Sequence, residues 1–196
     1  MMSTPRLQSR GVFVTECGML RLFSAIEIPP EIGEELEPHM DDLDGARWRD
    51  AESLHITLRF FGETPEPVAD DLDAELSQVT GAPFDLTLTG TGSFGVGHQS
   101  RAIWAGVEPL SPLKQLAGRC EAAARRAGLA AETRVFKPHV TLAYVRGLDP
   151  HGVASWTVKH NLLRTSPFRV TWFGLYSSRP GAAGGDYTLE KEYPLL

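Results

Sequence analysis

The sequence has few of the residues on which several classes of protein depend. It contains only two cysteines, Cys17 and Cys120, among 196 residues. Two cysteines provide neither a disulfide framework nor the spacing of zinc ligands, so we expect a reducing compartment, the cytoplasm. No apolar run is long enough to cross a bilayer, and no membrane partner is expected.

Positive charge is also scarce. The 19 Lys and Arg residues are outnumbered by 25 Asp and Glu residues, which gives a formal net charge of −6. Such a chain is unsuited to broad, sequence-independent binding of nucleic acid, because that binding depends on many phosphate contacts. A local basic cleft is compatible with it. The length and the 42% of apolar residues fit one globular domain with a substantial core.

The feature that stands out is one tetrapeptide that occurs nearly twice. Residues 55–58 read His-Ile-Thr-Leu, and residues 139–142 read His-Val-Thr-Leu. Alternation of aliphatic and polar residues predicts a strand in each case, with the His and the Thr on one face. One such copy is often only a half-solvated strand. Two copies make a shared functional role the better interpretation.

The spacing between the two copies recurs along the chain. The histidines are 84 residues apart, and the same offset relates Pro83 to Pro167 and Gly90 to Gly174. A constant offset predicts a duplicated unit of the order strand, helix, His/Thr strand, helix, strand. The two repeats would occupy about residues 20–91 and 102–177, and a last strand would follow at 187–193.

The duplication predicts an α+β fold with two lobes related by a pseudo-two-fold axis. Each repeat would form an antiparallel sheet with its helices outside, and the polar faces would meet at a central cleft. This single domain would span residues 19–196. We expect residues 1–18 to be a flexible leader, or to precede the true start at Met19. The glycine-rich run at 90–97 lacks the lysine and following helix of a nucleotide loop, so we interpret it as a flexible connection between the lobes.

The paired motifs suggest acid–base chemistry at phosphorus. Two imidazoles with ordinary pKa values of about 6.5 can act in opposite protonation states, one as base and one as acid. The hydroxyls of Thr57 and Thr141 would donate to the phosphate oxygens as charge develops. In-line displacement needs entering and leaving atoms on opposite sides of phosphorus, which a facing pair of histidines provides. No metal is implied, because no further ligand stands at a suitable spacing.

The two motifs resemble those of the 2H phosphoesterase superfamily, and the surrounding chain resembles its RNA 2′,3′-cyclic phosphodiesterase branch, also called 2′-5′ RNA ligases. The supporting stretches are residues 19–23, 54–62, 103–107, 134–143 and 175–179. The resemblance implies metal- and cofactor-independent hydrolysis of RNA 2′,3′-cyclic phosphate ends, tRNA fragments among them, to 2′-phosphates by a monomer. It also implies that His55 protonates the departing 3′-oxygen and that His139 activates water. The sequence alone leaves this order open.

Further residues are candidates for contact with substrate. By alternation Arg59 shares the face of His55, and Arg134 precedes the second motif; each could neutralise phosphate or be a solvated surface arginine. Phe136 could stack on the terminal base or belong to the core. Relatives often carry arginine at the position of Tyr144, whose side chain strand parity directs away from the catalytic face. The remaining histidines are expected at the surface: His39, His98, His151 and His160.

Two alternatives remain at this point. One is a 2H enzyme that acts on a small cyclic phosphate, such as a nucleotide or an ADP-ribose derivative. The other is a non-catalytic protein that binds RNA ends through the two histidines. Assays of RNA that ends in a cyclic phosphate beside the small cyclic phosphates distinguish the first alternative from an RNA-specific enzyme. The second predicts that His55→Ala and His139→Ala weaken binding modestly, with no turnover to lose.

Overall fold

The computed structural model describes residues 18–95, 101–179 and 186–196. Four α-helices lie in these ranges: α1 (Pro30–Leu36), α2 (Glu66–Leu76), α3 (Leu110–Arg126) and α4 (Pro150–Lys159). Two 3₁₀ turns are η1 (Glu37–His39) and η2 (Ala51–Ser53). The strands are β1 (Met19–Glu27), β2 (Arg47–Trp48), β3 (His55–Pro65), β4 (Phe84–Phe94), β5 (Ala102–Glu108), β6 (Val140–Tyr144), β7 (Phe168–Val170), β8 (Trp172–Arg179) and β9 (Asp186–Pro194).

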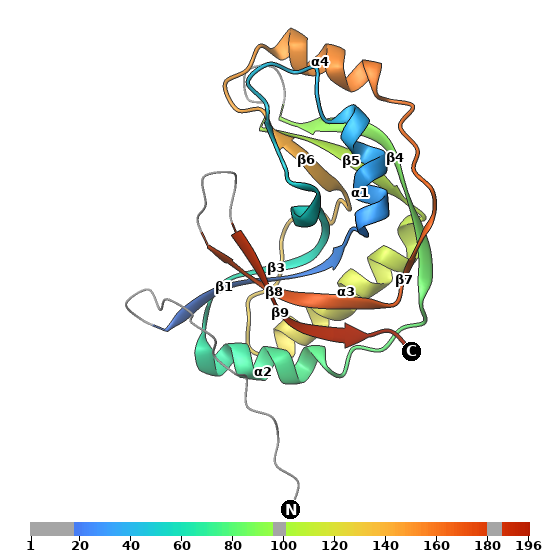
Figure 1. The fold of residues 1–196 in the computed structure, drawn as a ribbon. Coiled ribbons are helices and arrows are strands. Elements are labelled where there is room, and N and C mark those ends of the chain that lie inside the picture. The colour runs from blue at the N-terminus through green and yellow to red at the C-terminus, as the bar shows by residue number, and fades with distance from the viewer. Residues whose placement is uncertain (1–17, 96–100, 180–185) are drawn as a thin grey trace, which may run out of the picture.

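The strands form one curled antiparallel sheet, which confirms the α+β class (Figure 1). The strand order is β7-β4-β5-β6-β3-β1-β8-β9, and β2 pairs with β6. The two halves of the sheet meet where β3 pairs with β6, through Ile56 and Val140. Both residues are fully buried. The two lobes are therefore joined by backbone pairing between β3 and β6, at the point where the two His/Thr motifs lie.

The lobes exchange elements between the repeats. β8, from the second repeat, pairs with β1 of the first, and β4, from the first repeat, pairs with β5 of the second. Likewise α3 packs against α2 and β3. This differs from the expectation that each repeat would form its own lobe. The cause is local, because β4 and β5 follow one another in the chain and consecutive antiparallel strands tend to pair.

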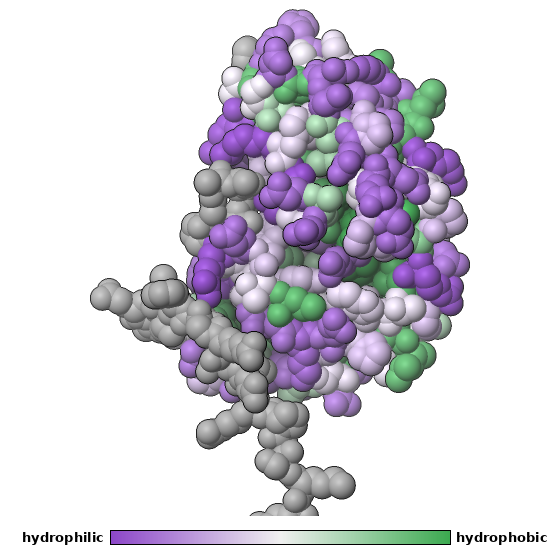
Figure 2. Space-filling model, viewed as in Figure 1, coloured by the Kyte–Doolittle hydropathy of each residue, from purple (hydrophilic) through white to green (hydrophobic). Residues whose placement is uncertain are grey.

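The helices cover the outer face of the sheet. In Figure 1, α2 lies at the lower edge beneath β1, β8 and β9, α3 crosses the lower half at the level of β8 and β9, and α1 and α4 lie in the upper part. One continuous apolar core, which includes Leu58, Leu72, Leu113 and Leu142, joins both parts. The face seen in Figure 2 is mostly hydrophilic, with scattered apolar side chains. No described helix is both long and apolar enough to cross a membrane.

The first helix is shorter than the proline pattern predicts. A helix is expected from Pro29 to about Leu43, but α1 ends at Leu36 and a 3₁₀ turn follows. Pro38 lies in that turn. Proline removes a backbone donor and its ring clashes with the preceding turn, so the α-helix ends before it.

The glycine-rich run is in part a strand. Gly90 to Phe94 continue β4, while residues 96–100 lie outside the described ranges. Gly92 allows a close approach, because a Cβ atom there would come within 2.3 Å of the Trp104 indole. Part of the run thus makes room for an aromatic ring from β5.

Candidate active site

The four motif side chains gather at the junction of β3 and β6. Because Ile56 pairs with Val140 in antiparallel register, His55 lies beside Thr141, and Thr57 lies beside His139. All four lie on the face opposite the buried pair. His55 and His139 are then diagonal neighbours, whose Cα atoms are about 7–8 Å apart in a regular sheet. One phosphate group fits between imidazoles at that spacing.

Each motif contains a β-bulge at its leucine. In the pairing of β1 with β3, Ala25 is opposite Thr57 and Ser24 is opposite Arg59, so Leu58 has no partner. In the pairing of β5 with β6, Trp104 is opposite Thr141 and Ile103 is opposite Ala143, so Leu142 has none. A bulge shifts the alternation by one residue. The residues that follow each leucine therefore change faces.

Both histidines are held by the same backbone contact. The Nδ1 atom of His55 lies 2.8 Å from the carbonyl oxygen of Ser53, and Nδ1 of His139 lies 2.6 Å from that of Lys137. A carbonyl only accepts hydrogen bonds, so Nδ1 carries the proton and donates it in each ring. Each Nε2 atom is left for a substrate. The contacts bind the residue two positions earlier in both copies, which is one more sign of the duplication.

His55 is surrounded by aromatic rings and a guanidinium. The rings of Phe23 and Tyr187 lie 5.2 and 5.0 Å from its centroid. The guanidinium of Arg49, itself buried, lies 5.0 Å from the centre of the Tyr187 ring. Burial lowers the pKa of His55 from 6.5 to about 4, and the charge of Arg49 contributes in the same direction. His55 is therefore neutral at pH 7.

His139 has a different set of neighbours. Phe94 lies 4.6 Å from its ring centroid, edge to face, and Trp104 lies 6.4 Å away. Burial lowers its pKa too, while the hydrogen bond to the Lys137 carbonyl opposes that effect. His139 lines an open groove of about 820 Å³. No arginine contributes to its shift, in contrast to His55.

The two threonines are placed to bind a ligand. Thr57 lines the same groove as His139, and both threonines are partly exposed. In the described part of the chain, neither hydroxyl has a hydrogen-bond partner in the protein. Two donors on the face of two imidazoles suit the non-bridging oxygens of a phosphate.

Arg59 does not share the face of His55, contrary to the prediction from alternation. The bulge at Leu58 turns its side chain toward α3, where its Nε lies 2.5 Å from Glu121 Oε2. Its other nitrogens donate to the carbonyls of Ala130 and Phe60, and Glu132 lies 3.4 Å away. The guanidinium thus ties β3 to α3 and to the chain that follows it.

Arg134 and Phe136 lie along the groove that begins at His139. Arg134 is exposed and binds Glu132 through Nη2, at 2.7 Å, and through Nε. These contacts lower the pKa of Glu132 to about 2. Phe136 is partly buried and packs against the core, and it also lines the groove. The structure therefore brings both residues near the second motif.

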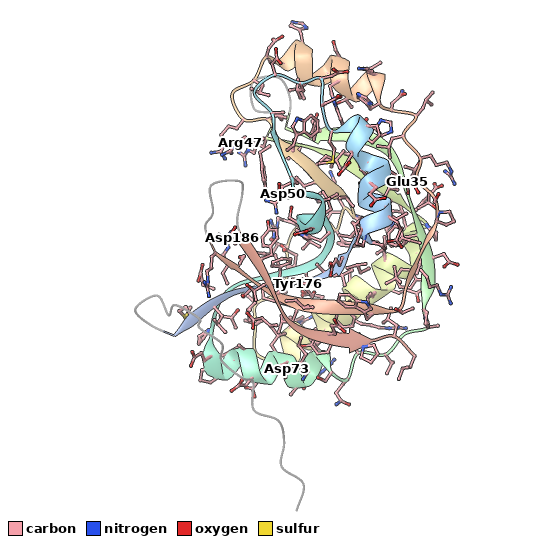
Figure 3. All side chains as sticks on the ribbon, viewed as in Figure 1. Glu35, Arg47, Asp50, Asp73, Tyr176 and Asp186 are labelled. Atoms are coloured by element: carbon pink, nitrogen blue, oxygen red, sulfur yellow. The ribbon has the colours of Figure 1, made fainter. Side chains whose placement is uncertain are left out.

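Tyr144 lies on the cleft side, and the prediction from strand parity is wrong. The bulge at Leu142 reverses its direction. Burial raises the pKa of Tyr187 beside His55, and interaction with Tyr144 raises it further. The guanidinium of Arg47 lies 5.9 Å from the Tyr144 ring centre. Figure 3 shows Arg47 in the upper part and Tyr176 on β8 in the lower part.

The sequence gives little sign of the residues that surround the histidines. Phe23, Trp104 and Tyr187 come from β1, β5 and β9, far from the motifs in the chain. The sequence does not single out Arg49 either, although it lies only six residues before His55. Its backbone N–H donates to the carbonyl of Leu142, inside the second motif, at 2.8 Å. Only the folded sheet shows that Arg49 interacts with both motifs, with His55 through its charge and with Leu142 through its backbone.

The expectation that the other histidines lie at the surface is wrong for His160. It is 8% exposed, and its Nδ1 atom lies 2.9 Å from that of His39. His151 is exposed as expected, and His98 lies outside the described residues. In the described ranges, no cluster of three or more His, Cys, Asp or Glu side chains could hold a metal ion.

A family model described as the 2′-5′ RNA ligase superfamily matches residues 28–182. The chain belongs to this superfamily. It is 32% identical over 134 residues to the RNA 2′,3′-cyclic phosphodiesterase of Archaeoglobus fulgidus, which covers 67% of this chain and 76% of that protein. With the protein of the same name from Escherichia coli it is 30% identical over 184 residues, 89% of this chain and 96% of the other.

Two solved structures have a similar fold. The crystal structure of Escherichia coli LigT complexed with 3′-AMP superposes with a TM-score of 0.73 at 29% identity, over 90% of this chain and 98% of that one. The crystal structure of TT0787 of Thermus thermophilus gives a TM-score of 0.74 at 26% identity, with the same coverage. These matches confirm the assignment to the 2H phosphoesterases that the paired motifs indicate.

Proposed function

We propose that this protein hydrolyses RNA 2′,3′-cyclic phosphate ends to 2′-phosphomonoesters without a metal. Curated relatives that match most of the chain carry the name RNA 2′,3′-cyclic phosphodiesterase, which supports cyclic phosphodiesterase activity. The observation that carries the mechanism is the register at the junction of the lobes, where each histidine lies beside the other motif's threonine. Such a site can surround one phosphorus with two proton carriers and two donors.

The reaction follows from this arrangement. The neutral Nε2 of one histidine takes a proton from water, and the water oxygen bonds to phosphorus. The bond from phosphorus to the 3′-oxygen breaks on the opposite side, and the Nε2–H of the other histidine protonates that oxygen. The hydroxyls of Thr57 and Thr141 hold the non-bridging oxygens throughout. The product keeps its phosphate on the 2′-oxygen.

We propose the order that the family resemblance implies, with His55 as proton donor and His139 as base. His55 is neutral at pH 7, since its pKa is about 4. A bound phosphate anion raises the pKa of both imidazoles, because opposite charge favours the protonated form. The donor is then charged only when substrate is present. This limits acid chemistry to the complex.

End-group analysis tests the function directly. A short oligonucleotide with a 2′,3′-cyclic phosphate is incubated with the enzyme in excess EDTA, and the position of the product phosphate is determined. We expect a 2′-phosphate at an undiminished rate. A 3′-phosphate product, or loss of activity on chelation, would contradict the proposal. Action as a monomer, in the cytoplasm and on tRNA fragments, stays a prediction.

A further inference from the structure

The groove that starts at Thr57 and His139 extends well beyond the reacting phosphate. It runs along α3, past Lys114 and Gly118, and its volume of about 820 Å³ is near the upper end of the range of about 300–1,000 Å³ for small-ligand sites. A single cyclic phosphate held between the two histidines would fill only the inner end of this groove and leave its outer part open to the rest of a larger substrate.

The charge of the groove is opposite to that of the protein. Four cations line it (Arg59, Lys114, Arg134 and Lys137), against two carboxylates (Glu121 and Glu132), so its formal charge is +2. The whole chain carries −6. Arg59 and Arg134 are paired with the two carboxylates. Among the described residues, neither lysine has a carboxylate partner.

The groove also contains aromatic surface. Phe60, Phe94 and Phe136 line it, and the neighbouring Val135 is 81% exposed. Single-stranded nucleic acid binds where cations follow its backbone and aromatic rings accept its bases. Two lysines that have no carboxylate partner within the described ranges, beside such rings, suit a single-stranded nucleic acid better than an acidic or an apolar ligand.

We propose that the groove along α3 binds the nucleotides that precede the terminal cyclic phosphate, with Lys114 and Lys137 facing their phosphates. This rests on the proposed function, because the reacting end must lie between His55 and His139. The enzyme then prefers oligonucleotide ends to cyclic mononucleotides. Lys114 acts in substrate binding alone, since it lies on α3 and not on either motif strand.

The test compares a mononucleotide with an oligonucleotide. Values of kcat/KM are measured for adenosine 2′,3′-cyclic phosphate and for a tetraadenylate with the same end. We expect the tetraadenylate to be preferred at low salt. Lys114→Ala lowers the kcat/KM of the tetraadenylate by about 3- to 10-fold, as for loss of one solvent-exposed hydrogen bond, and leaves that of the mononucleotide unchanged. The salt dependence of binding weakens by about 0.7 in log–log slope for that contact.

Two further variants sharpen the comparison. A Cβ atom at Gly118 would meet no atom within 4 Å, so Gly118→Trp fills the groove without disturbing the fold. It should abolish the preference for the tetraadenylate and retain turnover of the mononucleotide. Arg125→Ala is the matched control, since Arg125 is an exposed cation on α3 outside the groove. Arg125→Ala should leave kcat/KM unchanged for both substrates.

Equal kcat/KM for both substrates in the wild type, or an equal loss for both in Lys114→Ala, would overturn the proposal. Failure of the proposed function is a separate result, in which neither substrate is hydrolysed. In that case the readout is fluorescence anisotropy with a 5′-labelled tetraadenylate that ends in a 3′-phosphate. Weaker binding by Lys114→Ala still supports the groove, and unchanged binding overturns it.

Discussion

The two motifs have the same backbone and different surroundings. Each histidine donates to the carbonyl two residues before it, and each leucine is bulged. Around these shared features the side chains differ. His55 is enclosed by Phe23, Tyr187 and the charge of Arg49, whereas His139 has Phe94 and Trp104 as neighbours and lies at the inner end of a groove.

The comparison separates what duplication preserves from what it leaves to change. Backbone pairing fixes where the two imidazoles and two hydroxyls lie, and a shift of one residue would send them to the opposite face. Proton affinity depends instead on neighbours from other strands. A symmetric scaffold can therefore carry two histidines that titrate differently, as an acid and a base must.

The strongest test of the pair is to remove either imidazole. His55→Ala and His139→Ala should each reduce kcat by about 10²–10⁴-fold, because each removes one proton transfer. The double variant should be scarcely slower than the worse single one, since the residues act as a unit. Turnover of a cyclic-phosphate oligonucleotide gives the rates. As a control, His151→Ala, which changes an exposed histidine of α4, should leave kcat unchanged.

A substrate with sulfur in place of the 3′-oxygen distinguishes the two roles. A thiolate leaves without protonation, so this substrate restores the rate only to the variant that lacks the acid. Rescue of His55→Ala is the expected result. Rescue of His139→Ala alone would reverse the roles and make His55 the base, the role that its low pKa favours.

The difference in burial should also appear in stability at low pH. The pKa of His55 is about 4 in the folded protein against 6.5 for an ordinary imidazole. Between pH 6.5 and pH 4 this histidine is protonated in the unfolded chain but not in the folded protein. The free energy of unfolding therefore falls as the pH decreases from 6.5 to 4. The full shift corresponds to a loss of about 3 kcal/mol.

Urea denaturation at pH 7 and pH 4 measures this loss. His55→Asn keeps an N–H that can reach the Ser53 carbonyl but does not titrate, so we expect it to lose about 3 kcal/mol less than the wild type over that interval. His139 lies at the open groove, so His139→Asn should reduce this loss of stability by less than His55→Asn does. Equal recovery by both variants would mean that the two sites do not differ as described.

The motifs could be predicted from the sequence because their evidence is local. A His and a Thr two apart on a strand share a face whatever the rest of the chain does. The offset of 84 residues between the two copies indicates a duplicated unit, and a duplicated unit predicts a pseudo-symmetric fold. The alternation failed one residue later, at Leu58 and Leu142, since neither bulge is marked by a glycine. Arg59 and Tyr144 were consequently assigned to the wrong faces.

The partners of the motifs could not be predicted, because they depend on pairing between distant segments. The exchange of β4 and β8 between lobes brings Phe94 to His139 and Tyr176 to Phe23. An offset in sequence reports that two units are alike. It does not report with which unit a strand pairs. Packing over the whole sheet decides that choice.

The threonines provide a smaller test of symmetry. Thr57→Ala and Thr141→Ala should each lower kcat/KM by about 10-fold, since one donor to the phosphate is lost while both histidines remain. Thr→Ser at either position keeps the hydroxyl and should keep most of the activity. Similar losses at both positions would support equal roles in holding the phosphate. A loss at only one would show that the phosphate sits closer to one motif.

The smallest expected effect concerns Arg49, which makes the surroundings of the motifs unequal. Its positive charge lowers the pKa of His55, so Arg49→Gln should raise that pKa. The limb of the pH profile of kcat/KM that belongs to His55 then moves to higher pH, whether His55 acts as acid or as base. Arg47→Gln is the matched control, because Arg47 lies over the Tyr144 ring, only two residues before Arg49, and is not among the causes of the His55 shift. A limb that stays in place, or moves equally in both variants, would show that the inequality arises from burial alone.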